Sequence, residues 1–446
     1  MRRNGYDLLS RFEIHVPSRS ESCNSGAYAT PAVGLLLRDR LGALQERDFR
    51  LLFTATTITT LGDAVANIAL TFAVLRTLHG SASQLGIIVA ARLVASAAVL
   101  LAGGVISDRL PRNLVMAGAS LVQGVAQAVT AGALLSGNAS IGVLVVLQAL
   151  YGAGDGLVLP AEVGLVPQTV SAARLQEANA LQGMTRNLVF VLGPAIGGTL
   201  VVAGSPGIAL AIDAASFFVC ALILVRIRLV AVAREQGAGF FHELREGWRE
   251  FASRTWLWST VMLFGIGNVF FMFWPILGPT VVNERFGGAR PWVEIVVTGG
   301  VGAVVGGAVA LRYRPARPLV ACVALPLLYT LQFIALAFEA PVWLIAVAAF
   351  ASGLGIAIHI ALWFTVFQQE VPEHARSRVS SYDALGSFIL NPVGAAIAGP
   401  VAMAFGVKGA LLLAVGAILL LNLAMLMIPA VWSIRRHGEP TTMAVA

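Results

Sequence analysis

The stretch Gly103-Gly104-Val105-Ile106-Ser107-Asp108-Arg109-Leu110-Pro111-Arg112-Asn113 decides the fold of this chain. It lies between two long apolar runs, Gln84 to Ala102 and Leu114 to Leu135. The first run contains one charged residue, Arg92, and the second contains none. Charged side chains are costly in hydrocarbon, so the three charges of the stretch mark a turn at a membrane surface. Its glycines allow the two flanking helices to approach closely.

The composition indicates the broad class of protein. The chain has 446 residues, of which 57% are hydrophobic and 12% are charged. A soluble globular chain carries about 25% charged residues, so a polytopic membrane protein is expected. The formal net charge of +7 does not indicate a nucleic-acid partner, because the arginines lie in short loops and tails between apolar runs. The cysteines are far apart and have neither disulfide nor metal-ligand spacing.

The sequence contains twelve apolar stretches, each close to the roughly 20 residues that a transmembrane helix needs. An even number of spans places both termini on one side. Most loop arginines fall on that side, which the positive-inside rule makes cytoplasmic. We therefore expect an all-α, multi-pass protein of the plasma (inner) membrane with cytoplasmic termini. The expected spans are 51–75, 84–106, 114–135, 140–164, 180–203, 207–227, 256–282, 293–311, 317–338, 341–367, 381–405 and 407–431.

The longest internal polar segment divides these spans into two sets of six. Within it, the run from Phe240 to Phe251 has apolar residues on one helical face and charges on the other, which is typical of an interfacial amphipathic helix. The first tail is expected to be disordered, or to be an upstream extension from a misplaced start. The expected parts are a cytoplasmic tail (1–46), an N-terminal six-helix bundle (47–228), a cytoplasmic linker (229–255), a C-terminal six-helix bundle (256–432) and a second cytoplasmic tail (433–446).

The two halves read as diverged copies of one unit. Gly62-Asp63 in the first span recurs as Gly267-Asn268 in the seventh. The glycine pair Gly103-Gly104 recurs as Gly306-Gly307 at nearly the same separation. The second copy has an asparagine in place of the carboxylate, so the first half is expected to carry the ion chemistry.

No enzyme motif is present in the sequence. It has no glycine-rich phosphate loop followed by lysine, no ATP-binding domain and no cluster of metal ligands. We therefore expect neither enzymatic activity nor a cofactor or metal. The driving force must then be an ion gradient or the gradient of the substrate itself.

Four charged residues lie deep in the expected spans, where each is costly and is a candidate functional group. Asp63 is either a carboxyl that takes and releases a proton as access alternates, or a static hydrogen-bond partner. Arg92 needs a counter-charge, which either Asp63 or Asp155 can supply, and Asp155 is also a candidate partner for Arg186. Such pairs either line a switchable cavity or fix helix packing, and the sequence leaves both readings open.

Three further polar residues are interpreted as structural. Asp213 lies about one turn into the sixth span and is interpreted as an anion near a helix N-terminus. His359 is interpreted as a packing residue rather than a proton relay. Asp383 is interpreted as a surface or capping group.

The opening stretch resembles the signature loop between the second and third helices of the major facilitator superfamily. That pattern is Gly, three residues, Asp-Arg and then a basic pair; Gly104, Asp108, Arg109 and Arg112 match it, and Asn113 departs from it. The resemblance implies that Asp108 faces the start of the eleventh helix and closes the cytoplasmic side. The candidate partners in this cytoplasmic gate are Arg109, Arg112, Glu162 and Arg378.

The fifth span contains Gly193-Pro194-Ala195-Ile196-Gly197-Gly198, which resembles the end of the antiporter signature of exporters in the superfamily. The upstream glycines of that signature are replaced by Ala180 and Val189. The partial match favours export without establishing antiport. The residues expected to serve close helix packing are Gly193, Pro194, Gly197 and Gly198.

The wider pattern is similar to the branch of the superfamily that contains the enterobactin exporter and macrolide efflux proteins. The resemblance covers about residues 47–432 and includes Asp48-Phe49-Arg50-Leu51-Leu52. It implies two six-helix bundles that rock and expose a central cavity to each side in turn.

The predicted function is therefore secondary active export of an amphiphilic small molecule, coupled to protons. The substrate class would be a drug, a macrolide-like natural product or a siderophore. One alternative is an uncoupled or lipid-type facilitator, and another is a non-transporting sensor or assembly protein on the same scaffold. The expected partners are the substrate, protons and membrane lipids, and the expected oligomeric state is a monomer.

Overall fold

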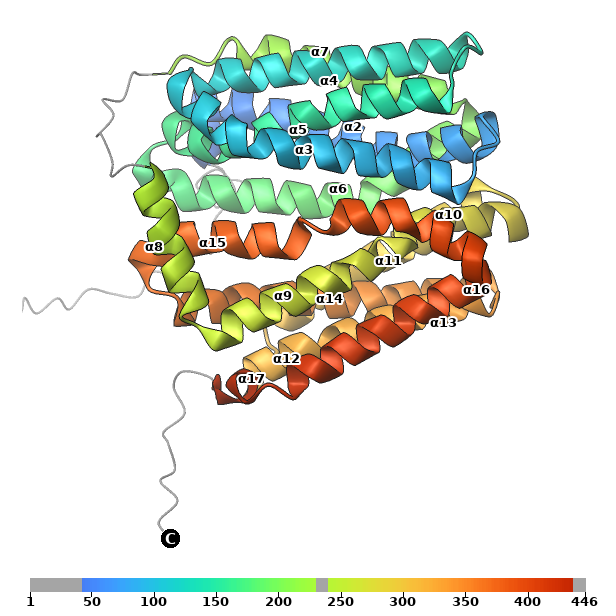
Figure 1. Ribbon diagram of the computed structural model, residues 1–446. Coiled ribbons are helices and arrows are strands. Elements are labelled where there is room, and N and C mark those ends of the chain that lie inside the picture. The colour runs from blue at the N-terminus through green and yellow to red at the C-terminus, as the bar shows by residue number, and fades with distance from the viewer. Residues whose placement is uncertain (1–41, 230–239, 436–446) are drawn as a thin grey trace, which may run out of the picture. The chain divides into compact units, whose positions relative to one another are not determined.

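The computed structural model describes residues 42–229 and 240–435 (Figure 1). Within these ranges the structure does not describe the side chains of residues 101–109, 172, 187, 190, 191, 240–244, 373, 374, 377 and 378. Helices make up most of the described chain, and no strand occurs in it. The expectation of an all-α fold is confirmed.

The first half consists of helices joined by short connections, so each begins at the end where the preceding one stops. Backbone groups in hydrocarbon must bond one another, which is why the apolar runs are helical. Two helices begin at serines, Ser140 and Ser205, whose hydroxyls accept hydrogen bonds from backbone N–H groups of the first turn. The elements are η1 (Gly42–Gln45), α2 (Arg47–Phe72), the π-helix η2 (Ala73–Thr77), α3 (Ala82–Arg109), α4 (Arg112–Leu135), α5 (Ile141–Thr169), η3 (Ala172–Arg174), α6 (Leu175–Ala203) and α7 (Pro206–Leu224).

The second half follows the same course but has more interruptions, where two helices share one expected span. A turn at Met272 separates α9 from α10, and another separates α15 from α16. The Asn268 side chain donates to the Ser387 carbonyl, 2.8 Å away, close to both interruptions. The elements are α9 (Thr255–Phe271), α10 (Phe273–Arg285), α11 (Ala289–Ala310), α12 (Pro318–Ala324), η4 (Leu325–Leu328), α13 (Tyr329–Ala337), α14 (Val342–Glu370), α15 (Glu373–Phe388), α16 (Asn391–Leu426) and α17 (Pro429–Ser433).

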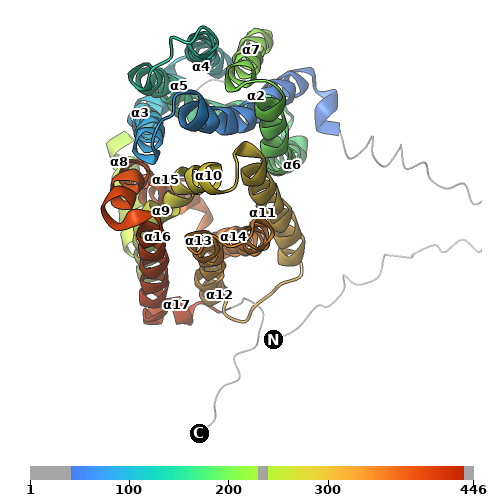
Figure 2. The ribbon, with the colours of Figure 1, turned by 90° about the vertical axis from the view of Figure 1, so that its right-hand side faces the viewer.

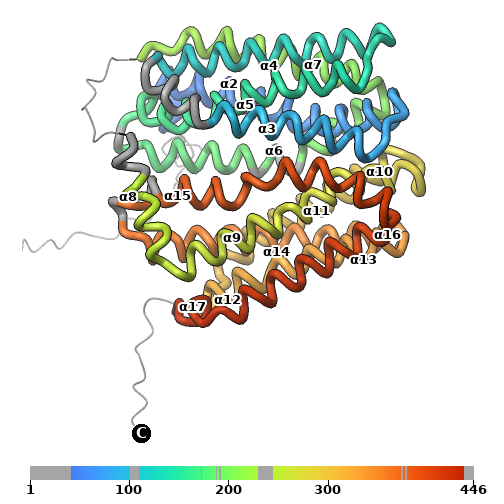
Figure 3. Tube along the Cα trace, viewed as in Figure 1, coloured from blue at the N-terminus to red at the C-terminus, as the bar shows by residue number. Residues whose placement is uncertain are grey.

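A helix also occupies the segment between the halves. This helix, α8 (Phe240–Ala252), packs against α9 and α15 (Figures 1 and 3). Its Phe251 ring stacks on Tyr382 of α15, with centroids 5.9 Å apart. The remainder of the expected linker, 230–239, lies outside the described residues.

The predicted boundary of the first tail, at residue 46, lies too far along the chain. Gly42–Gln45 form a short 3-10 helix in which Ala43 is fully buried. Arg174 donates to the Gly42 carbonyl over 2.6 Å, which holds this turn against the start of α6. Residues 1–41 and 436–446 lie outside the described part of the chain.

Ten helical stretches in the described chain are long and apolar enough to cross a membrane. The last of them, Val379–Leu426, is interrupted by the turn between α15 and α16 and by a break at Gly406, where φ is 72°, so it holds three helical runs. Within the described residues, the helix α6 contributes only the shorter apolar stretch Leu192–Ala203. The count of twelve spans therefore stays a prediction.

The two halves meet at one end of the helices, which we call the sealed end. Gly86 of α3 lies against the Ala395 carbonyl of α16, and Gly399 of α16 lies against Ser83 of α3. Gly198, near the end of α6, contacts Val293 in the first turns of α11. Figure 2 views the helices end on. The other end, which carries η1 and α8, we call the linker end.

Candidate functional site

A cluster of charged side chains lies inside the first half, and Arg92 of α3 is at its centre. The Arg92 Nε donates to Asp155 Oδ2 of α5 over 2.9 Å. The same guanidinium lies 4.0 Å from Asp63 Oδ1 of α2 and donates to the Asn67 side chain over 3.2 Å. One arginine is therefore shared by two carboxylates, as the sequence left open.

Glycines bring the helices of this cluster together. A Cβ at Gly152 of α5 would overlap the backbone carbonyl of Arg92 and lie 2.9 Å from its Cα. One turn on, a Cβ at Gly156 would lie 2.5 Å from the Ser96 carbonyl. Small residues allow this close approach. The charged group of Arg92 is thereby held beside α5, where Asp155 lies.

The two carboxylates are bound unequally. Asp155 also accepts from the Gln123 amide over 2.8 Å, so both of its oxygens have close partners. Asp63 accepts from the Tyr151 hydroxyl, but its distance to the guanidinium is longer. The Arg92 guanidinium also lies 4.2 Å above the centre of the Tyr151 ring. With two carboxylates and one cation, a proton on Asp63 removes an excess negative charge and leaves the tighter ion pair intact.

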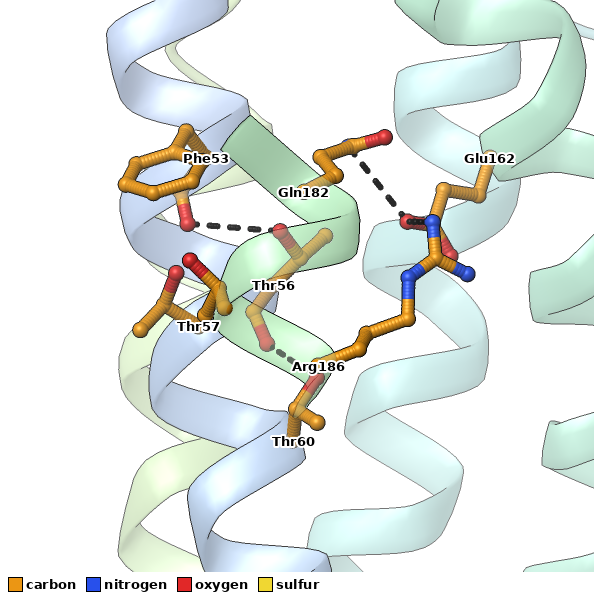
Figure 4. A pocket seen from close by; sticks show the side chains of 8 residues that line it. Phe53, Thr56, Thr57, Thr60, Glu162, Gln182 and Arg186 are labelled. Atoms are coloured by element: carbon orange, nitrogen blue, oxygen red, sulfur yellow. Dashed lines mark hydrogen bonds and ion pairs between the residues drawn. The ribbon is translucent and has the colours of Figure 1, made fainter. Parts of the chain in front are cut away.

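A polar pocket lies nearer the linker end, between α2, α5 and α6, with about 220 Å³ of empty space that includes part of the open solvent (Figure 4). Arg186 approaches Glu162 to 3.9 Å, and the Gln182 amide donates to the same carboxylate over 3.5 Å. The expected pairing of Arg186 with Asp155 is therefore wrong, because Glu162 lies on the turn of α5 that faces α6. The pocket is lined by Phe53, Thr56, Thr57, Thr60, Glu162, Gln182, Thr185 and Arg186.

The threonines of this pocket retain hydrogen-bonding capacity. The hydroxyls of Thr56 and Thr60 donate to backbone carbonyls of α2 over 3.0 and 2.7 Å, which leaves their lone pairs free to accept. The buried Thr57 hydroxyl has no hydrogen-bond partner among the described groups. The pocket therefore offers acceptors, one aromatic ring and a weakly paired carboxylate to a ligand.

The expected cytoplasmic gate is only partly described. Arg112 donates to the Gly164 carbonyl of α5 over 2.6 Å. Glu162 belongs to the pocket just described. The side chains of the other expected gate residues lie outside the described groups, namely Gly104, Asp108, Arg109 and Arg378. The gate therefore stays a prediction.

The glycines of the fifth span lie at close helix contacts. Gly193 contacts Ala64 of α2. A Cβ placed on Gly197 would lie 2.9 Å from the Val65 Cα. Gly198 faces the other way and contacts α11 of the second half. Pro194 lies within α6 between these contacts. The segment Gly193–Gly198 thus contacts α2 of its own half and α11 of the second half.

Sequence reasoning missed the uncharged members of the cluster, Tyr151 and Gln123. It also misplaced Asp213, which is the eighth residue of α7, fully buried, and bonded to the Gln127 amide over 2.8 Å. Its interpretation as a helix N-terminal anion is wrong, because Ser205 caps α7 and no acidic residue lies in the first turn. A usable signal was the spacing of Gln123 and Gln127, two amides on one face of a charge-free span.

The second half has no comparable charged cluster in its described part. His359 of α14 has its Nδ1 2.8 Å from the Cys322 carbonyl. Asp383 of α15 accepts from the Trp363 indole over 3.0 Å. Both are single polar groups with local partners. Among the described residues, no group of three His, Cys, Asp or Glu side chains could hold a metal ion.

Comparisons with known proteins place these features in a family. A family model described as Major Facilitator Superfamily matches residues 52–395. The chain is 26% identical over 404 residues to the multidrug efflux pump Tap of Mycobacterium tuberculosis, covering 86% of this chain and 93% of that protein. It is 27% identical over 398 residues to Tap of Mycolicibacterium fortuitum, with coverages of 85% and 95%.

Solved structures of low sequence identity share the fold. A bacterial homologue of the human lysosomal transporter Spinster, in an inward-facing and occupied conformation, has a TM-score of 0.67 at 15% identity, covering 88% of this chain and 99% of that one. The nucleoside transporter NupG has a TM-score of 0.65 at 11% identity, with coverages of 87% and 100%. With the matched family model and the apolar spans, this makes the chain a multi-pass membrane transporter, not an enzyme, that belongs to the major facilitator superfamily.

Proposed function

We propose that this protein exports small amphiphilic molecules by alternating access and exchanges them for protons at Asp63. The observation that carries the proposal is the sharing of Arg92 between two carboxylates, of which Asp63 is the more loosely bound. The similarity to the multidrug efflux pumps named Tap supports the export of drug-like substrates. We propose twelve spans, with α6 as the fifth, and cytoplasmic termini in the inner membrane.

The conformation supports a cavity that opens toward the linker end. The close contacts between Gly86 and Ala395 and between Gly198 and Val293 join the halves at the sealed end. The pocket around Glu162 lies on the other side of the Arg92 cluster. With cytoplasmic termini, this is a state that takes up substrate from the cytoplasm.

The proton acts by changing how strongly Arg92 joins α3 to α2. When Asp63 is ionised, the guanidinium is attracted to both α2 and α5. When Asp63 is protonated, the attraction to α2 is weaker and the ion pair to Asp155 remains. A contact that differs between two conformations shifts their equilibrium by that difference, so proton binding can drive the change in access.

The pocket suggests what part of a substrate is recognised in the first half. Glu162 is partnered only loosely, by Arg186 at 3.9 Å and Gln182 at 3.5 Å, and Phe53 supplies an apolar face. A planar or aliphatic group with an attached amine would use both. Thr60 lies one turn from Asp63 on α2, so a bound substrate and the proton site are near neighbours along the same helix.

The test uses everted membrane vesicles that contain the protein and a fluorescent lipophilic cation. Wild-type vesicles are expected to accumulate the dye only while a pH gradient exists, and Asp63→Asn vesicles are expected to show no accumulation above background. The matched control is Asp383→Asn, which removes a hydrogen-bonded carboxyl from the second half and should retain accumulation. Equal accumulation by wild type and Asp63→Asn would exclude Asp63 as the coupling group. Equilibration of the dye without accumulation, at a rate that does not depend on the pH gradient, would favour an uncoupled facilitator.

A further inference from the structure

The carboxyl of Asp213 lies in the first half, outside the charged cluster and outside the pocket. It is fully buried, and its Oδ2 accepts from the Gln127 amide over 2.8 Å. Its Oδ1 has the Ser216 hydroxyl 3.5 Å away. Among the described residues no ion pair includes Asp213, because Arg92 is engaged by the two other carboxylates.

The surroundings of Asp213 contain few charges. The groups that interact with it electrostatically are Asp63 on α2, Arg92 on α3 and Asp155 on α5. The helix α4 presents the uncharged Gln127 amide instead. An ionised carboxylate here would be buried without a cation at contact distance, beside two other carboxylates.

One turn of α2 lies directly against the Asp213 carboxyl. A Cβ at Gly62 would overlap Asp213 Oδ1 and lie 2.6 Å from the Ser216 hydroxyl. Gly62 and Asp63 are neighbours in sequence, so they face different sides of the helix. Asp63 faces Arg92, and Gly62 covers Asp213. The two carboxyls therefore lie against adjacent faces of one turn of α2.

A chain of amides leads away from Asp213. The Gln148 amide of α5 donates to Gln127 Oε1 over 3.3 Å, and Gln127 in turn donates to Asp213. Both glutamines are 1% exposed. The Gln148 Oε1 atom is buried and has no partner among the described groups. A buried acceptor of this kind is normally satisfied by a water molecule or another donor.

We propose that Asp213 is a second proton-binding site of the first half, occupied by a proton in this conformation and connected to its surroundings through Gln127 and Gln148. Burial of a lone carboxylate in an apolar helix bundle is far costlier than burial of a neutral carboxyl that has a hydrogen-bond donor. Gln127 supplies that donor. The unpartnered oxygen of Gln148 is where a water molecule would enter the path.

This site would complement the proton exchange at Asp63, and only that link rests on the proposed function. A neutral Asp213 leaves Asp63 free to ionise opposite Arg92, because no second negative charge lies behind Gly62. Loss of the Asp213 proton would place like charges against adjacent faces of that turn. The two sites would therefore not be ionised together.

Infrared difference spectroscopy of the purified protein in lipid bilayers tests the site without any transport measurement. At neutral pH, wild type is expected to show a protonated-carboxyl C=O band that shifts in D₂O. This band should persist in Asp63→Asn and be lost in Asp213→Asn. The control is Glu294→Gln, which changes an exposed carboxyl that pairs with Arg290 and should leave the band unchanged. An unchanged band in Asp213→Asn would overturn the proposal.

Two further variants keep the test decisive if Asp213→Asn does not fold. Gln127→Leu removes the donor to Asp213, so the band should move to higher frequency; a band that does not move is not that of Asp213. Gln148→Leu removes the outer amide, so deuterium exchange into the band should slow several-fold. Exchange at the wild-type rate would overturn the path. Because Asp63→Asn keeps the band, failure of proton-coupled export and failure of this site give different results.

Discussion

The two halves pack their helices in the same way but differ in charge at the contact. In the first half, Gly152 of α5 lies against the backbone of Arg92, so that a Cβ placed on Gly152 would lie 2.9 Å from the Arg92 Cα. In the second half, Gly302 of α11 lies against the backbone of Phe350 of α14. A Cβ placed on Gly302 would likewise lie 2.9 Å from the Phe350 Cα. Such a helix pair is thus packed without an ion pair at this contact. The ion pair between Arg92 and Asp155 is not needed for packing, which favours a functional explanation.

The largest expected effect is that of removing Arg92, the cation at the centre of the charged cluster. Arg92→Leu leaves Asp63 and Asp155 without the cation that both approach. Because these side chains are only partly buried, the loss of stability should lie below the roughly 3–5 kcal/mol that breaking a fully buried ion pair costs. We expect a lower thermal unfolding midpoint in detergent and a loss of dye accumulation. The corresponding change in the second half, His359→Leu, removes one neutral hydrogen bond and should cost much less. Equal losses would contradict the functional difference between the halves.

A smaller effect of equal size in both halves is expected from changes to the glycines. Gly152→Ala and Gly302→Ala each place a methyl group against the backbone of the neighbouring helix, and overpacking costs about 1–3 kcal/mol. Thermal unfolding midpoints should fall by similar amounts. Gly132→Ala is the control, because nothing lies within 4 Å of its built Cβ. If only Gly302→Ala lowers the midpoint, the ion pair does contribute to packing of the first half.

The smallest effect is expected in the pocket. Glu162→Gln keeps the shape of the side chain and its contact with Gln182 but removes the charge. The concentration for half-maximal transport of a cationic amphiphile should rise several-fold, and that of an uncharged amphiphile should change little. Dose–response curves in vesicles measure both. Equal changes for the two substrates would mean that Glu162 does not recognise charge.

Much of the fold could be predicted from the sequence, because apolar runs and loop charges follow directly from the cost of polar groups in hydrocarbon. Asp63, Arg92 and Asp155 could be identified for the same reason. Which of them pair could not, because pairing depends on how each helix is rotated about its axis. The sequence thus left Arg92 with two candidate partners, and the structure brings both to it.

Two predictions from the sequence, for Arg186 and Asp213, are wrong for the same physical reason. Arg186 pairs with Glu162 instead of Asp155, because the two carboxylates lie at different levels of the same helix α5. The interpretation of Asp213 as a helix-end anion is wrong because α7 begins at Pro206, which places Asp213 about two turns inside the helix. In both cases the sequence identified a charged residue within a span. It could not show how deep the residue lies in its helix or which side chain faces it, because both depend on the three-dimensional packing of the helices.

The most direct test of the central claim compares two kinds of transport by Asp63→Asn in proteoliposomes. One assay follows uphill accumulation driven by an imposed pH gradient, and the other follows exchange of labelled for unlabelled substrate without a gradient. If Asp63 couples protons to export, the variant should exchange substrate at a rate near that of wild type but fail to accumulate it. Retention of both activities would contradict the account, because the proton would then bind elsewhere.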